Sequence, residues 1–148
     1  MYTVRHLLQE KGSQVWSIAP QTTVYEALQL MADKNVGALL VVQGGNVAGM
    51  FTERDYARKV VLQGRSSKTS TVGELMTHDV LYVSPDDTIE NCMAIMTDKR
   101  LRHLIVMDNG KLAGIVSIGD VVKAIISDRE FTIRELERYI TGGHSSLT

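Results

Sequence analysis

The chain has 148 residues, of which 44% are hydrophobic, so it can bury a core, and this disfavours intrinsic disorder. Sixteen Lys and Arg residues oppose 17 Asp and Glu residues, and this formal charge of −1 disfavours general binding to DNA or RNA. The longest apolar run covers only residues 36–42, whereas a bilayer span needs about 20 residues, so no membrane segment is expected.

The first residues and the cysteine content indicate the compartment. The N-terminus has no charged stretch followed by a long apolar segment, as a secretory signal would have. The lone Cys92 can form no internal disulfide, and no Cys and His residues have the spacing of a zinc site. We therefore expect a cytoplasmic protein without a metal.

A tandem repeat with a fixed offset of 65 residues organises the chain. Residues 15–61 match residues 80–126 without a gap over 47 positions. The identities include Pro20/Pro85, Thr23/Thr88, Met31/Met96, Asp33/Asp98, Lys34/Lys99, Val41/Val106, Gly49/Gly114 and Asp55/Asp120. One copy of this size is too small to be stable alone, so we expect the copies to pack on each other with pseudo-two-fold symmetry.

Each copy is predicted to form a β-α-β-β-α unit, which gives an α+β fold. In copy one the pattern predicts strands at 15–18, 38–42 and 47–51 and helices from about 24 and 52. In copy two the corresponding strands are expected at 80–83, 104–107 and 112–116, with helices from about 89 and 117. Hairpin turns are expected at 44–46 and 108–110, and capping boxes at Thr23 with Glu26 and at Asp87 with Glu90.

The segments outside the copies complete the predicted organisation. It consists of an N-terminal helix (1–14), repeat one (15–62), a linker (63–79) with a helical turn at 72–76, repeat two (80–127) and a C-terminal helix and tail (128–148). The C-terminal helix is expected to begin at a Thr132–Glu135 capping box, with Phe131 stapled onto Leu136, and to end at Gly142-Gly143. Its stripe of Ile133, Leu136 and Ile140 either packs back on the module or forms a subunit interface.

A hydroxyl and a carboxylate three residues apart close each copy, where the last strand becomes a helix. They are Thr52 with Asp55 and Ser117 with Asp120. This spacing is typical of a capping box, which satisfies the first helical N–H groups. The same groups also suit a nucleoside phosphate, because a helix start attracts phosphate and a carboxylate accepts the hydrogen bonds of a ribose diol. Both interpretations stay open at this point.

The repeated unit, with Gly49-Met50-Phe51-Thr52-Glu53-Arg54-Asp55 echoed by Gly114-Ile115-Val116-Ser117-Ile118-Gly119-Asp120, resembles the cystathionine β-synthase (CBS) domain pair, or Bateman module. The resemblance covers about residues 15–62 and 80–127. It implies a regulatory module that binds adenosine-containing ligands such as AMP, ADP, ATP, NAD or S-adenosylmethionine in one or two clefts between the repeats. It also implies a homodimer and the absence of catalysis.

The resemblance assigns ligand contacts residue by residue. The hydroxyl and Asp that close a repeat hold phosphate and ribose in the family, and Ser117 with Asp120 match them in copy two. A basic pair before the central strand contacts phosphate in the family, and Arg102 with His103 match that pair. Copy one has Gly37-Ala38 at those positions, so the implied contact with phosphate is asymmetric.

Two clefts of unequal strength are therefore implied. The better equipped cleft combines these four residues of copy two with positions of copy one, namely Thr22, Ala27, Val36, Gly37 and, reaching across, Arg54. The second cleft lies around Thr52, Asp55 and Asp87. Asp87 places a carboxylate where the first cleft has the hydroxyl of Thr22, and its negative charge is expected to weaken phosphate binding there.

The sequence thus favours a non-catalytic adenine-nucleotide sensor that signals to an unknown regulated protein or through its own dimer. A purely structural dimerisation module is the first alternative, in which the hydroxyl–carboxylate pairs serve only as caps. An oxidoreductase that uses bound NAD is a weaker alternative, because His103 is the only candidate for a general acid or base.

Overall fold

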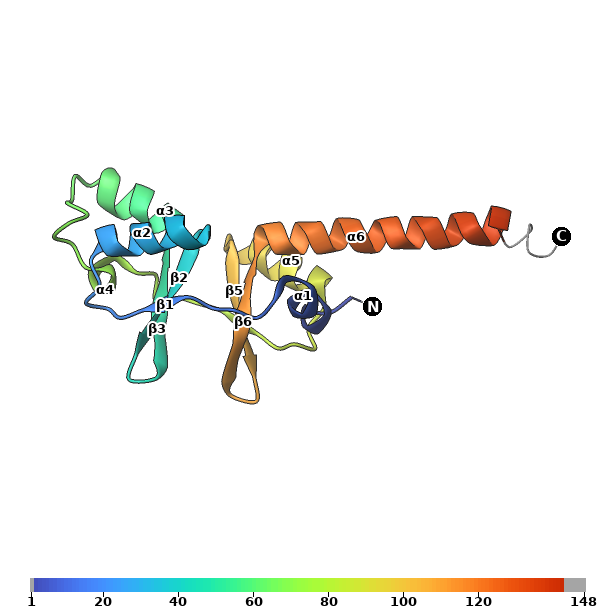
Figure 1. The fold of residues 1–148 in the computed structure, drawn as a ribbon, viewed down its shortest axis with the longest axis horizontal. Helices are drawn as coiled ribbons and strands as arrows, with labels where there is room; N and C mark the ends of the chain where they lie inside the picture. The colour runs from blue at the N-terminus through green and yellow to red at the C-terminus, as the bar shows by residue number, and fades with distance from the viewer. Residues whose placement is uncertain (1, 143–148) are drawn as a thin grey trace. The chain divides into compact units, whose positions relative to one another are not determined.

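The computed structural model describes residues 2–142 and divides into two compact units, each built around one repeat (Figure 1). The first-repeat unit is Gln14–Leu81. The second-repeat unit joins the residues up to Ser13 with those from Tyr82 onward. The N-terminal helix therefore belongs to the second repeat, an association that the order of segments along the chain did not predict.

The first-repeat unit contains a mixed three-stranded sheet and its helices (Figure 1). Its elements are β1 (Ser17–Ile18), α2 (Val24–Lys34), β2 (Ala38–Gln43), β3 (Asn46–Thr52), α3 (Glu53–Asp55), a π-helical segment (Tyr56–Val61) and α4 (Val72–Leu75). The strand order is β1-β2-β3, with β1 parallel and β3 antiparallel to β2. The predicted β-α-β-β-α order and the helical turn in the linker are confirmed.

The second-repeat unit has the same sheet with the same order, β4-β5-β6. Its elements are α1 (Val4–Lys11), β4 (Tyr82–Val83), α5 (Ile89–Lys99), β5 (His103–Asp108), β6 (Lys111–Ser117), α6 (Ile118–Glu137) and a π-helical end (Arg138–Gly142). The hairpin registers repeat as well, since Leu40 faces Met50 and Ile105 faces Ile115.

The hairpin turns explain why both registers agree. Gly44 and Gly45 in the first turn, and Asn109 and Gly110 in the second, all have positive φ angles between 52° and 81°. Two consecutive left-handed residues form a type I′ turn, whose twist matches that of the flanking strands. Glycine and asparagine adopt this conformation at low cost, so the turn residues themselves set the pairing of the strands that lead to the candidate site.

Each unit also contains one helix from outside its repeat. The helix α1 precedes repeat one in the sequence but packs on repeat two, and α4 precedes repeat two but packs on repeat one. Thr3, which caps α1, forms an antiparallel bridge with Thr88, and Thr71, which caps α4, forms one with Thr23. The two associations are related by the repeat, because each bridge ends on the threonine that caps the first helix of a repeat. A glycine in the last strand of each sheet, Gly49 in β3 and Gly114 in β6, lets these segments approach closely. A Cβ at Gly114, for example, would lie 2.8 Å from the Leu8 side chain.

Buried side chains of the sheets and helices form the core. In the first-repeat unit the core cluster comprises Val24, Ala27, Met31, Leu39, Val41, Phe51, Val60, Val72 and Leu75. In the second-repeat unit the fully buried side chains include Ile89, Cys92, Leu104, Ile105, Val106, Val116 and Val121. The apolar runs that predicted buried strands therefore form the centre of each sheet.

Several local predictions were wrong. The cap of α5 is Thr88, which accepts a hydrogen bond from the Asn91 amide, and the predicted Asp87–Glu90 capping box is absent. Asp87 instead accepts a hydrogen bond from the Ser84 amide in the preceding turn. The first strands of both sheets are only two residues long, because only those residues pair with the central strand.

The C-terminal region differs most from its prediction. One continuous helix, α6, runs through Thr132, whose hydroxyl donates to the Asp128 carbonyl instead of capping a new helix. Phe131 and Leu136 are both exposed and lie within this helix, so the predicted staple at a helix start does not form. Gly143, the second of the expected helix-ending glycines, lies outside the described residues.

Candidate functional site

Both hydroxyl–carboxylate motifs are capping boxes in the structure. The amide of Asp55 donates to Thr52 Oγ1 at 3.1 Å, and the amide of Thr52 donates to Asp55 Oδ2 at 3.0 Å. In the second repeat, the amide of Asp120 donates to Ser117 Oγ at 3.1 Å, and the amide of Ser117 donates to Asp120 Oδ2 at 2.9 Å. The capping interpretation is therefore confirmed, and each motif is prearranged at the start of a helix.

The remaining environment of Asp55 occupies its carboxylate. The hydroxyl of Thr77 donates to Asp55 Oδ1 at 2.8 Å, and Lys59 Nζ lies 3.1 Å from the same oxygen. Oδ2 accepts from both the amide and the hydroxyl of Thr52. The side chain is only 7% exposed. Asp55 is thus a buried structural carboxylate, with no oxygen left over for a ribose in this arrangement.

Asp120 has a different environment, although it occupies the same place in its repeat. Lys11 from α1 lies 2.6 Å from Oδ2 and also donates to the Ile115 carbonyl at 2.9 Å. All the hydrogen bonds of the Asp120 carboxylate to described residues fall on Oδ2. Its side chain is 26% exposed, and Oδ1 keeps the capacity to accept hydrogen bonds because the described residues donate none to it.

The charge of Asp120 is stabilised by its partners. Burial alone would raise the pKa of the Asp120 carboxyl, but the hydrogen bonds from Lys11 and Ser117, together with the charge of Lys11, outweigh burial and lower this pKa below its ordinary value. The carboxylate is therefore ionised at neutral pH, and ionised carboxylates accept hydrogen bonds only.

We expect the Asp120→Asn variant to lose less free energy of unfolding than the unmodified chain when the pH falls from 7 to 3. A carboxyl whose pKa is lower in the folded than in the unfolded state stabilises the fold above its unfolded pKa of about 3.9, and this contribution is lost as the pH falls through the folded pKa. Urea denaturation at both pH values measures the difference. The exposed Asp98→Asn variant is the control and should keep the original pH dependence; an unchanged dependence in Asp120→Asn would contradict the prediction.

The predicted basic pair lies at the same end of the second-repeat unit. His103 begins β5 opposite Ser117, and the Arg102 carbonyl accepts the amide of Ile118 at 2.8 Å. The Arg102 side chain is exposed. Burial lowers the pKa of the His103 imidazole and outweighs the opposing effect of Asp120, so His103 is neutral at pH 7. Of this pair, only Arg102 brings a positive charge to the site.

The equivalent end of the first repeat is more acidic. The Gly37 carbonyl accepts the amide of Glu53, and a Cβ at Gly37 would lie 2.7 Å from the Glu53 carboxylate. Gly37 therefore leaves room for a neighbouring carboxylate, a role that the sequence did not predict. Arg54 follows Glu53 and is half-buried, with no ion pair to a described residue.

The other predicted contact residues lie in or next to the first helix of each repeat. Thr22 is half-buried before α2, and Val36 is half-buried after it. Ala27 lies within α2 and is fully buried in the core cluster, so its side chain exposes no surface in this structure, and the expected contact with adenine stays a prediction. Asp87 is half-buried before α5, where the Asn91 side chain donates to it at 3.3 Å.

The structure brings the predicted residues together only in part. Arg102, His103, Ser117 and Asp120 gather at the start of α6, whereas Thr52, Asp55 and Gly37 gather at the start of α3. Sequence analysis missed Lys11, Lys59 and Thr77, which contact the two aspartates. Only the i, i+4 spacing of Asp55 and Lys59 gave a signal; Lys11 meets Asp120 through tertiary packing.

Other kinds of site find no support within residues 2–142. These residues contain no group of three or more His, Cys, Asp or Glu side chains arranged to hold a metal ion. Burial raises the pKa of the Cys92 thiol to about 11, so the thiol stays protonated at neutral pH. None of the described helices combines the length and the apolar character that crossing a bilayer requires.

Comparison with known proteins identifies the family. The family model of the CBS domain matches residues 4–62 and 72–127. The mitochondrial CBS domain-containing protein CBSX3 of Arabidopsis thaliana is 43% identical over 138 residues, which is 90% of this chain and 66%, just under two thirds, of that protein. The predicted cytoplasmic location stays a prediction, since this relative is mitochondrial.

Solved structures show the same fold. A protein with CBS domains from Burkholderia ambifaria MC40-6 has a TM-score of 0.82 and 53% sequence identity, with 85% of this chain and 95% of that chain covered. The CBS domain pair of protein MJ0100, solved with 5′-methylthioadenosine and S-adenosyl-L-methionine, has a TM-score of 0.76 at 21% identity, over 86% of this chain and 98% of that chain. With both repeats matched by the family model and carrying the same sheet, this chain belongs to the CBS domain family and contains a pair of CBS repeats.

Proposed function

We propose that this chain is a regulatory module that binds an adenosine-containing ligand, with the start of α6 as the phosphate and ribose end of the site. The observation that carries the proposal is the contrast between the two aspartates. Asp120 Oδ1 accepts no hydrogen bond from the described residues, and the exposed Arg102 lies at the same end of the unit, whereas both oxygens of Asp55 are occupied within its own unit. One of the two repeats is therefore equipped to bind a ribose.

The chemistry of the α6 start fits a nucleotide better than a bare anion. Arg102 supplies a cation for phosphate, and Lys11 offsets the charge of Asp120, which would otherwise repel phosphate. The open carboxylate oxygen can accept from the 2′- and 3′-hydroxyls of a ribose. His103, neutral at pH 7, adds an N–H donor without charge.

The first repeat is proposed to complete this site through residues around the two ends of α2, which are Thr22, Val36 and Gly37, with Arg54 as a further cation. Ala27, being buried, is left out of the proposed contacts. The second proposed site, around Thr52, Asp55 and Asp87, is the weaker one, because Glu53 and Asp87 add negative charge and Asp55 is already engaged.

The ligand class follows from the chemistry of the site and from one neighbour. The CBS pair of protein MJ0100 was solved with two adenosine compounds, so this fold accommodates them in at least one protein. AMP, ADP, ATP, NAD and S-adenosylmethionine all carry the ribose that Asp120 would bind. We favour the phosphate-bearing members, because Arg102 is suited to a phosphate.

The proposed role is regulatory and not catalytic. A ligand that contacts both repeats would stabilise one arrangement of the chain by its difference in affinity between arrangements. The regulated partner would be another protein or a second copy of this chain. A ligand-free structural module is the alternative, and the capping boxes observed in both repeats are consistent with it.

Thermal unfolding with adenosine, AMP, ATP, NAD and S-adenosylmethionine, each added separately, tests the proposal. A ligand present at 100 times its Kd adds about 2.7 kcal/mol of stability, which raises the Tm by several degrees. We expect Asp120→Ala to remove the shift for every adenosine compound. Arg102→Gln should reduce the shift for AMP but not for adenosine, and it should leave the ligand-free Tm unchanged because its side chain is exposed.

Asp98→Ala, on the exposed end of α5, is the matched control and should keep every ligand-dependent shift. Since Asp120→Ala also removes one half of a capping box and an ion pair, its ligand-free Tm will fall, and only the difference between the Tm with and without ligand is compared. If no adenosine compound shifts the Tm of the unmodified chain, the sensor proposal fails and the structural module is favoured.

A further inference from the structure

Lys11 connects the N-terminal helix α1 to the aspartate of the proposed ligand site. Its ammonium lies 2.6 Å from Asp120 Oδ2 and donates to the Ile115 carbonyl at 2.9 Å. Leu8, one turn before Lys11 on the same face of α1, lies against Gly114. The packing of α1 on the last strand therefore places Lys11 at the aspartate.

In the first repeat the equivalent contacts come from Thr77. Its amide donates to the Met50 carbonyl at 2.8 Å, and its hydroxyl donates to Asp55 Oδ1 at 2.8 Å. These two acceptors are the counterparts, at the offset of 65 residues, of the two acceptors of Lys11. One positively charged side chain in the second repeat thus takes the place of a backbone amide and a neutral hydroxyl in the first.

The second repeat lacks the cations that the first repeat carries near its own aspartate. Arg54 and Lys59 lie on either side of Asp55, and the positions that match them are Gly119 and Ala124. Lys59 forms an ion pair with Asp55 from within the same repeat. In the second repeat the corresponding ion pair comes from outside the repeat, through α1.

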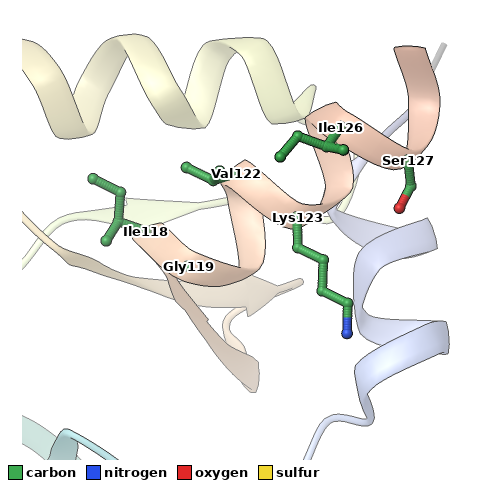
Figure 2. Close-up of a pocket in the computed structure, with 6 residues that line it drawn as sticks. All are labelled: Ile118, Gly119, Val122, Lys123, Ile126 and Ser127. Carbon is green, nitrogen blue, oxygen red and sulfur yellow. The ribbon is translucent and has the colours of Figure 1, made fainter. Parts of the chain in front are cut away.

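Figure 2 shows the first turns of α6 in a close-up of a shallow pocket on this helix. Gly119 leaves the first turn without a side chain next to Asp120, and a Cβ there would lie at an ordinary contact distance of 3.7 Å from Ser117 Oγ. Lys123, one turn later, extends away from Gly119 (Figure 2). The ion pair that the structure gives Asp120 is with Lys11, so α1 supplies the charge that this part of α6 lacks.

The charge of Lys11 acts on the other side chains of the site as well. Burial is the main cause of the lowered pKa of the His103 imidazole, and the charges of Lys11 and Arg102 lower it further against the opposing effect of Asp120. The side chains of Lys11 and Asp120 are 34% and 26% exposed, so water and salt screen their charges only in part. A charged ligand group at the start of α6 would therefore interact with Lys11.

We propose that Lys11 is a positioning residue that determines the charge selectivity of the site. By holding Asp120 Oδ2 and neutralising its charge, Lys11 leaves Oδ1 for a ribose and allows an anionic phosphate to bind nearby. Without Lys11 the carboxylate repels the phosphate of AMP and attracts the sulfonium that S-adenosylmethionine carries at the same 5′ carbon. This inference deepens the proposed nucleotide site and rests on it.

Isothermal titration calorimetry of the full chain with AMP, adenosine and S-adenosylmethionine tests the proposal. Lys11→Met removes the charge but keeps a stem of similar length, and we expect it to raise the Kd for AMP about tenfold or more. The Kd for adenosine should rise less than about threefold, and that for S-adenosylmethionine should not rise, because neither carries a phosphate. Lys11→Arg, which keeps the charge, should restore most of the affinity for AMP. Equal weakening of all three ligands would indicate a merely structural role and overturn the proposal.

Two further variants separate the role of Lys11 from net charge and from direct contact with phosphate. Lys111→Met makes the same change of charge at the far end of β6, where Lys111 is exposed, and should leave every Kd unchanged. In an Asp120→Asn background, Lys11→Met should change the Kd for AMP less than about threefold, because no carboxylate charge is left to neutralise. An undiminished loss in that background would show that Lys11 binds phosphate itself, and would overturn its action through Asp120.

Failure of this inference is distinguishable from failure of the proposed function. If the unmodified chain binds none of the three compounds, the nucleotide site is refuted and the role of Lys11 with it. If the unmodified chain binds AMP and Lys11→Met binds it equally well, the nucleotide site stands and only the role of Lys11 is overturned. Far-UV circular dichroism of each ligand-free variant checks that the fold is kept.

Discussion

Phe51→Ala is expected to lower the free energy of unfolding of the first-repeat unit by about 3–5 kcal/mol, as truncation of a large buried aromatic side chain does. Phe51 is fully buried on β3 and belongs to the core cluster with Leu39 and Val41. The loss combines the lost burial of the ring with the cavity that remains. Urea denaturation followed by circular dichroism measures this change.

The repeat provides a matched comparison for this variant. Val116 occupies the same position in the second-repeat unit and is also fully buried, but its side chain is smaller. Val116→Ala should therefore cost about 2 kcal/mol. Phe131→Ala, on the exposed part of α6, should cost less than about 0.5 kcal/mol. Equal losses for Phe51→Ala and Phe131→Ala would show that the β3 side chain does not lie in the core.

Asp55→Ala is expected to cost about 2–4 kcal/mol, because it removes one half of the capping box at the helix that follows β3 and leaves buried donors without an acceptor. Thr52 and Thr77 donate hydrogen bonds to this carboxylate, Lys59 forms an ion pair with it, and the Asp55 side chain is 7% exposed. Its loss also removes one side-chain contact between the sheet and the segment after α4, because the Thr77 hydroxyl donates to Asp55, while the backbone bridge between Thr77 and Met50 remains. Thermal and urea unfolding measure the effect.

Asp120→Ala is the comparison, because it removes the same half of the capping box in the second repeat. Asp120 is more exposed, and among the described residues its ion pair is with Lys11, so we expect a loss of about 1–2 kcal/mol. Asp55→Asn, which keeps the shape and one acceptor oxygen, should recover part of the loss of Asp55→Ala. If Asp120→Ala proved the more damaging variant, the assignment of Asp55 as structural and Asp120 as open to ligand would be reversed.

The sequence determined the architecture of each repeat because the signals involved are local. Apolar runs such as 38–42 and 104–107 have the length of buried strands, and the turns between strands contain Gly and Asn, which adopt the left-handed conformation at low cost. The fixed offset of 65 residues transferred each assignment from one copy to the other. It also pointed to Thr88 as the counterpart of Thr23, although local spacing favoured Asp87 as the cap.

Only the tertiary structure decided how the two site ends differ, because the deciding contacts join residues far apart in the chain. Asp55 and Asp120 are identical by repeat, yet one is buried under Thr77 and Lys59 while the other meets Lys11 and keeps an open oxygen. The sequence likewise left open whether the C-terminal stripe packs back on the module. In the structure it stays exposed, because α6 continues straight from the capping box at Ser117 and carries the apolar residues past the sheet of its unit.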